Sequence, residues 1–212
     1  WLSVLEKEFP KKPKADIRIL DIGTGPGFFP MILAEAGYHV DAVDYTEGML
    51  EKAKENAKRE KTDYKRFFKI VNKHFVIYSE RSGFYKYYEA LINSLLKKSN
   101  ITIHYITNDP DDAVFELAKS NAKIKPYYIG QKKLITLMMK MDADIVAMTT
   151  PDLDNFYIKR SLVRKDVEYI YVPHDMMSVH MGFRKASLDH FDTIFCTGEH
   201  VAREVRKTEE VY

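Results

Sequence analysis

Short apolar runs alternate along this chain with longer segments of mixed apolar and polar residues. The short runs favour strands and the longer segments favour helices. The short apolar run Ile17–Ile22 lies between a charged segment and a glycine cluster, which predicts a buried strand. Residues Phe28–Ala36 are typical of a helix with Gly37 at its C-cap, and His39–Asp44 predicts a second strand. A further helix is expected from Thr46 into a very polar stretch.

A second series of strands and helices follows that polar stretch. Strands separated by helix-length segments pair in parallel through right-handed crossovers, so helices should cover both faces of the sheet. The sequence therefore predicts an α/β fold, a Rossmann-like parallel sheet with helices on both faces, preceded by a partial Rossmann-like βαβα unit. The expected strands of this series are His74–Ser79, Ile101–Thr107, Ile124–Ile129, Asp144–Thr149, Glu168–Val172 and Thr193–Thr197. The expected helices are Tyr85–Lys98, Asp112–Ser120, Lys132–Met141, Ala186–His190 and Glu199–Glu209.

The change between the two series predicts two domains, residues 1–65 and 66–212. Charge is dense and apolar periodicity fades across Lys58–Phe67, which marks the expected seam. The surrounding stretch Lys52–Lys73 is basic, with three aromatic residues interleaved. This pattern favours a solvated helix, and it leaves open a peripheral contact with a membrane surface.

Composition narrows the classes of function. Hydrophobic residues make up 45% and charged residues 30% of the 212, as in soluble globular proteins, and the net charge of +2 argues against a nucleic-acid partner. A single cysteine excludes an internal disulfide framework and fits a reducing compartment. No window approaches the ~20 apolar residues that span a bilayer. We expect a cytoplasmic protein, at most associated with the inner face of the cell membrane.

A glycine-rich turn closes the first strand and opens the following helix. Its glycines, at positions 23, 25 and 27, permit backbone angles barred to other residues and allow a ligand to approach closely. Asp44 ends the second strand, where a carboxylate can accept hydrogen bonds from ribose hydroxyls. A strand, this turn, a helix and an acid at the end of the next strand together predict a nucleotide or nucleoside ligand. The alternative is a tight turn without a ligand.

Two segments of this region resemble the class I S-adenosylmethionine-dependent methyltransferases. Residues 19–27 look like their first motif, and residues 43–50 like the end of their second strand with the helix that follows. The resemblance covers about residues 15–60, and that family's adenine-contacting and catalytic segments do not follow. We therefore expect weakened cofactor binding in place of a working methyltransferase. The resemblance implies that Gly23, Gly25 and Gly27 line the methionine and ribose, that Asp44 binds the ribose, and that Asp21 lies near the amino-acid end of S-adenosylmethionine.

In the second series, polar residues gather where strands end, which is where parallel sheets bind ligands. His174 follows an apolar strand, and its ordinary pKa suits a general base. A structural histidine is the alternative, although polar neighbours favour function. The candidate site residues here are Thr150, Asp152, His174, Ser178, His180 and Arg184.

Four segments, 78–87, 148–153, 174–180 and 191–198, are similar to the CDP-glycerol glycerophosphotransferases of teichoic acid biosynthesis. The resemblance covers about residues 68–212 and implies the N-terminal, acceptor-side domain of a GT-B enzyme. It implies attack of a glycerol hydroxyl of a glycerol-phosphate polymer on CDP-glycerol, with CMP leaving. His174 would deprotonate that hydroxyl, with His180 as the reserve candidate and Arg184 on phosphate.

The main interpretation is therefore a fragment of a glycerophosphotransferase-like enzyme joined to a partial methyltransferase unit. Because GT-B enzymes hold the donor nucleotide mostly in a C-terminal domain, we expect the chain alone not to turn over CDP-glycerol. Two alternatives stay open: an S-adenosylmethionine-dependent methyltransferase, and a non-catalytic α/β module that binds a nucleotide-like ligand.

Overall fold

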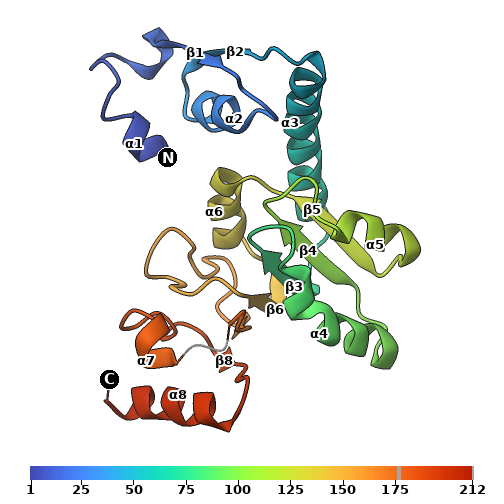
Figure 1. Cartoon of the computed structure of the whole chain (residues 1–212). Coiled ribbons are helices and arrows are strands. Elements are labelled where there is room, and N and C mark those ends of the chain that lie inside the picture. The colour runs from blue at the N-terminus through green and yellow to red at the C-terminus, as the bar shows by residue number, and fades with distance from the viewer. Residues whose placement is uncertain (176–177, 212) are drawn as a thin grey trace. The chain divides into compact units, whose positions relative to one another are not determined.

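The computed structural model describes residues 1–175 and 178–211, and Met176, Met177 and Tyr212 lie outside the described residues. The chain divides into two compact units, Trp1–Thr62 and Asp63–Tyr212. We call them the N-terminal and the C-terminal unit. The boundary falls inside one helix, and each unit has its own parallel sheet (Figure 1).

The N-terminal unit is a βαβα arrangement built on two parallel strands. Residues of β1 and β2 lie in register from Arg18 opposite His39 to Ile22 opposite Val43. One face of this sheet packs on a small core of Ile17, Leu33 and Tyr38. The elements are α1 (Leu2–Leu5), the 3₁₀ helix η1 (Lys14–Asp16), β1 (Arg18–Ile22), α2 (Phe28–Glu35), β2 (His39–Val43) and the start of α3 (Glu47–Phe68).

The C-terminal unit holds a six-stranded, all-parallel sheet in the order β5-β4-β3-β6-β7-β8. The chain moves outward from β3 to β5 and then returns to place β6 against the other side of β3. The strand order therefore reverses between β3 and β6. The strands are β3 (Lys73–Ser79), β4 (Ile103–Thr107), β5 (Ile124–Tyr128), β6 (Ala143–Met148), β7 (Glu168–Tyr171) and β8 (Thr193–Ile194). The helices are α4 (Tyr85–Lys98), α5 (Val114–Ser120), α6 (Gln131–Met139), α7 (Val179–Gly182) and α8 (Glu199–Val211).

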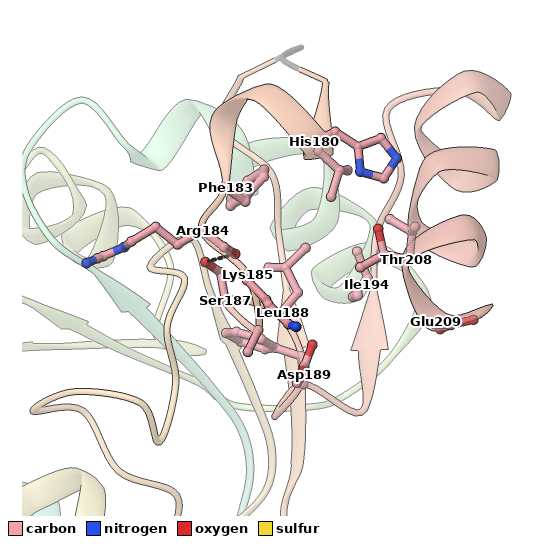
Figure 2. A pocket seen from close by; sticks show the side chains of 14 residues that line it. His180, Phe183, Arg184, Lys185, Ser187, Leu188, Asp189, Ile194, Thr208 and Glu209 are labelled. Carbon is pink, nitrogen blue, oxygen red and sulfur yellow. Dashed lines mark hydrogen bonds between the residues drawn. The ribbon is translucent and has the colours of Figure 1, made fainter. Parts of the chain in front are cut away.

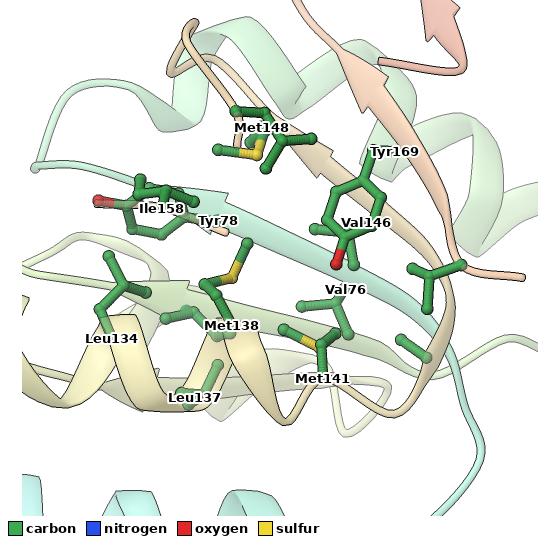
Figure 3. Close-up of a cluster of buried hydrophobic side chains, with 14 of the residues drawn as sticks. Val76, Tyr78, Leu134, Leu137, Met138, Met141, Val146, Met148, Ile158 and Tyr169 are labelled. Carbon is green, nitrogen blue, oxygen red and sulfur yellow. The ribbon is translucent and has the colours of Figure 1, made fainter. Parts of the chain in front are cut away.

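Alternate residues of β3 face two separate cores. Val76 and Tyr78 join a cluster with α6 and the end of α3, and Figure 3 shows them with Met138 of α6. Phe75 and Ile77 join a second cluster with α4 and α5 on the opposite face. Because β3 is buried on both faces, its apolar run is continuous, as parallel strands between helices require. The predicted α/β class, with helices on both faces of a parallel sheet, is confirmed.

One helix predicted in the C-terminal unit is wrong, and one predicted strand is shorter than expected. Residues Ala186–His190 form turns in place of a helix, and Ala186 has a φ of 65°, a left-handed angle that interrupts a right-handed helix. The strand expected over Thr193–Thr197 ends at Ile194 because it pairs only with the short edge of β7. The predicted seam Lys58–Phe67 contains the boundary between the two units, and the chain is continuous helix across it.

No helix in the described part of the chain is both long enough and apolar enough to cross a membrane.

Candidate functional site

The glycine turn of the N-terminal unit connects β1 to α2 through three left-handed residues. Gly23, Gly25 and Gly27 have φ values of 75°, 54° and 90°. A Cβ atom placed on Gly23 or Gly25 would meet nothing within 4 Å, so the backbone there stays open to a ligand. A Cβ on Gly27 would lie 2.6 Å from the Cβ of Ala53, so this glycine is required for the close packing of α3.

Hydrogen bonds to residues at the end of β2 hold this turn in place. The backbone N–H groups of Gly23 and Thr24 both donate to the Val43 carbonyl, at 2.8 and 3.2 Å. Asp44 follows directly, and its carboxylate accepts from the N–H of Gly25 at 2.7 Å and from the N–H of Thr46 at 2.8 Å. These two bonds, that of Thr46 first, lower the pKa of Asp44, so the side chain is an ionised acceptor at neutral pH. Each carboxylate oxygen retains a lone pair for a further donor.

Two polar atoms beside the turn lack partners. Among the described residues, nothing bonds to the buried Oδ2 of Asp21 or to the buried hydroxyl of Thr24. Buried polar atoms are normally hydrogen-bonded, and unsatisfied ones call for a ligand or water. An ammonium group near Asp21 and ribose hydroxyls near Asp44 would supply the donors that these acceptors lack. The acceptor groups of Asp21 and Asp44 therefore fit S-adenosylmethionine, which carries both an ammonium group and ribose hydroxyls.

The second candidate site lies at the carboxyl edge of the sheet in the C-terminal unit. Thr150, just after β6, donates its hydroxyl hydrogen bond to Glu80, just after β3. This contact bridges the point where the strand order reverses, the usual ligand position in open α/β sheets.

His174 lies just beyond the end of β7 and is held by aromatic rings. Its imidazole stacks on Phe84 with centroids 5.4 Å apart and meets the edge of Tyr87 at 5.9 Å. Its Nε2 lies 3.9 Å from Oδ2 of Asp175, while its buried Nδ1 has no partner among the described residues. The ring is thus positioned by packing, with one nitrogen beside a carboxylate.

The remaining candidates have contacts of their own. Arg184 pairs with Asp152 at 2.8 Å and lies over the ring of Phe156. Ser178 donates to Glu204 of α8 at 2.9 Å. His180 is exposed on α7. Among the described residues, no hydrogen bond or ion pair joins His174 to these side chains, and their common site stays a prediction.

Sequence reasoning missed three residues that shape these sites. Thr24 lies within the glycine motif, where a hydroxyl residue between two glycines was a usable signal. Glu80 directly follows a strand, a position already known to favour ligand contacts. Glu204 lies on a charged helix, 26 positions after Ser178 in the sequence. A contact between residues so far apart in sequence cannot be predicted from a local pattern.

Comparison with known proteins supports one of the two resemblances. Residues 19–72 match the model of a methyltransferase domain family, from β1 to just before β3. No curated protein and no solved structure matches the chain. The βαβα arrangement and this match support a Rossmann region in residues 19–72 like that of class I S-adenosylmethionine-dependent methyltransferases. Nothing found supports the glycerophosphotransferase resemblance, which stays a prediction.

Proposed function

We propose that the N-terminal unit binds S-adenosylmethionine, as the cofactor-binding half of a methyltransferase domain. The observation that carries the proposal is the ionised Asp44 carboxylate held against the glycine turn by the Gly25 and Thr46 N–H groups. The open backbone at Gly23 and Gly25 and the unpaired Asp21 oxygen support it. The bound cofactor would supply an electrophilic methyl group. The chain's own residues bind and orient it.

Substituting Asp44 by asparagine should weaken S-adenosylmethionine binding to the full chain by about 10- to 100-fold. A hydrogen bond to a charged acceptor contributes about 1.5–3 kcal/mol, and about 1.4 kcal/mol corresponds to tenfold in affinity. Isothermal titration calorimetry measures the change. The asparagine oxygen can still accept one of the two backbone N–H bonds that the Asp44 carboxylate accepts, so part of the support of the turn is retained.

Asp41→Asn is the matched control because Asp41 is also on this strand segment and only pairs with Arg18 at the surface. It should bind as wild type does. Equal affinity of Asp44→Asn and Asp41→Asn for S-adenosylmethionine would refute the assignment of Asp44.

We propose glycerol phosphate transfer as a second candidate function, for the C-terminal unit. The observation that favours it is His174, held by Phe84 and Tyr87 beyond the end of β7 with Asp175 beside it. In this proposal His174 accepts the proton of a glycerol hydroxyl, CDP-glycerol is the donor substrate, and a glycerol-phosphate polymer is the acceptor. Thr150, Asp152, Ser178 and Arg184 remain proposed substrate contacts, and His180 the reserve base.

This second proposal predicts that glycerol 3-phosphate shifts the ring resonances of His174 in NMR spectra of the full chain. His190→Gln, an exposed histidine outside this edge, should leave the response unchanged, whereas His174→Gln should remove it. A spectrum in which no His174 resonance moves at saturating ligand argues against a glycerol phosphate site at this edge.

A further inference from the structure

An open cavity of about 400 Å³ lies within the C-terminal unit, between α8 and the segment that joins α7 to β8. Figure 2 shows its two sides, with Thr208 and Ile194 on one and Ser187 and Leu188 on the other. The volume lies within the ~300–1,000 Å³ typical of small-molecule sites. Asp44 and His174, which carry the two functions proposed above, do not line it, whereas Arg184 and His180, the proposed substrate contact and reserve base of the second function, do.

Half of the residues that line this cavity are apolar, and two of these are aromatic. Phe183 and Phe191 both contribute, and both rings pack against Tyr171, at centroid distances of 5.7 and 5.4 Å and interplanar angles of 88° and 65°. These contacts hold the two phenyl rings in place. Aromatic rings prefer such edge contacts with one another, so the cavity offers a fixed surface for a further ring. The aliphatic lining consists of Val179, Ala186, Leu188, Ile194 and Val205.

The polar groups around the cavity balance one another. Arg184 and Lys185 are offset by Asp189 and Glu209, so the formal charges of these four lining residues cancel. Arg184 is already paired with Asp152, and Figure 2 shows its side chain pointing away from α8. A charged ligand would meet lining charges of both signs, so its lost hydration would be only partly offset, which is costly.

The lining hydroxyl groups are also engaged. Thr208 donates to the Glu204 carbonyl at 3.0 Å, and Ser187 donates to the Arg184 carbonyl at 2.7 Å. Neither hydroxyl hydrogen is free to fix a polar ligand group. Apolar contact is thus the main interaction that this cavity can offer.

The two sides of the cavity are joined by one carboxylate. Glu204 of α8 accepts from the Ser178 hydroxyl at 2.9 Å and from the Val179 N–H at 2.7 Å, at the start of α7. These bonds lower the pKa of Glu204, which is therefore ionised at neutral pH and makes the stronger, charge-assisted kind of bond. These bonds connect α8 to the start of α7, on the two sides of the cavity.

We propose that this cavity binds an uncharged small molecule with an aromatic ring. The ring would lie between Phe183 and Phe191 on one side and Val205 of α8 on the other. The site is independent of the S-adenosylmethionine site proposed for the N-terminal unit.

The uncharged fluorescent probe N-phenyl-1-naphthylamine tests this proposal on the full chain. We expect saturable binding at one site, with an increase in probe fluorescence. Thr208→Trp places an indole in the cavity from α8 and should weaken binding by about tenfold or more, since it occupies part of the ligand volume. Lys207→Trp adds the same side chain at an exposed position next to it, outside the lining, and should bind as wild type does.

The anionic probe 8-anilinonaphthalene-1-sulfonate supplies the charge control and should bind about tenfold more weakly than the uncharged probe. Equal affinity for both probes, or equal binding by Thr208→Trp and Lys207→Trp, would overturn the proposal. Should Thr208→Trp lose its circular dichroism spectrum, nuclear Overhauser effects decide the question in the wild type. They should join the naphthyl ring to the methyl groups of Ile194 and Val205, and their absence at saturation would also overturn it.

Discussion

Substituting Gly27 by alanine is expected to destabilise the N-terminal unit by about 2–5 kcal/mol and to abolish its binding of S-adenosylmethionine. The new Cβ would lie 2.6 Å from Cβ of Ala53 and 3.3 Å from its Cα, and an alanine has no flexible end that could move aside. Overpacking of this kind costs about 1–3 kcal/mol. The left-handed φ of 90° adds about 1–2 kcal/mol for any residue with a Cβ.

Fluorescence of Trp1 during urea unfolding can measure this effect, because Trp1 is the single tryptophan of the chain and lies 5.9 Å from the ring of Phe29. Gly37→Ala is the matched control. Gly37 also has a left-handed φ, of 97°, but a Cβ there would meet nothing within 4 Å. It should cost only about 1–2 kcal/mol. If both variants unfold at the same urea concentration, the packing of α3 on Gly27 is not the constraint that we infer.

The C-terminal unit is expected to lose roughly 3 kcal/mol of stability between pH 7 and pH 4 through His104 alone. This histidine is buried, stacks on Tyr127 and contacts the Tyr127 hydroxyl at 3.0 Å. Burial, and then the nearby charges of Lys73, Lys125 and Arg66, lower the pKa of His104 from 6.5 to about 4. The unfolded chain therefore binds a proton below pH 6.5 that the folded chain binds only near pH 4.

The direction of this change in stability follows from the linkage between folding and the protonation of His104. The stabilisation is fully present above pH 6.5 and is lost as the pH falls toward 4, at about 1.4 kcal/mol for each pH unit in that range. Urea unfolding followed by near-ultraviolet circular dichroism of the tyrosines measures it at pH 7.5, 5.5 and 4.5. His104→Gln removes the titrating group and retains polar atoms for Tyr127. The difference in unfolding free energy between wild type and variant should change with pH, and a pH-independent difference would contradict the assignment.

The sequence predicted most elements of both units because their apolar residues follow simple periods. The helix Tyr85–Lys98 has the predicted bounds, since Tyr88 and Ile92 mark a buried face four residues apart. The predicted seam Lys58–Phe67 lies within α3 and contains the boundary between the two units, which follows Thr62. The face of α3 that is buried there includes Asn56 and Asp63, and Asp63 accepts the Tyr128 N–H at 2.9 Å. Buried polar residues of this kind cannot be recognised from hydrophobicity, so the sequence predicted a solvated helix here and not the buried face that α3 has.

The candidate site of the N-terminal unit was also largely predictable. A turn built from left-handed glycines and an acid at the next strand end are local features, so Gly23, Gly25, Gly27 and Asp44 could be named from spacing alone. The environment of His174 could not, because Phe84 and Tyr87 are about ninety positions away and reach it only through the order of the strands. The pairing of Arg184 with Asp152, 32 positions earlier in the chain, likewise could not be read from local spacing.

The most direct test of the proposed cofactor site is an amide ¹H–¹⁵N spectrum of the full chain during titration with S-adenosylmethionine. The backbone resonances of Gly23, Gly25 and Thr46 should shift together and saturate, because their N–H groups surround the Asp44 carboxylate and the open turn. Resonances that stay unchanged in the N-terminal unit at saturating cofactor, or that shift only beyond Thr62, would contradict the proposal.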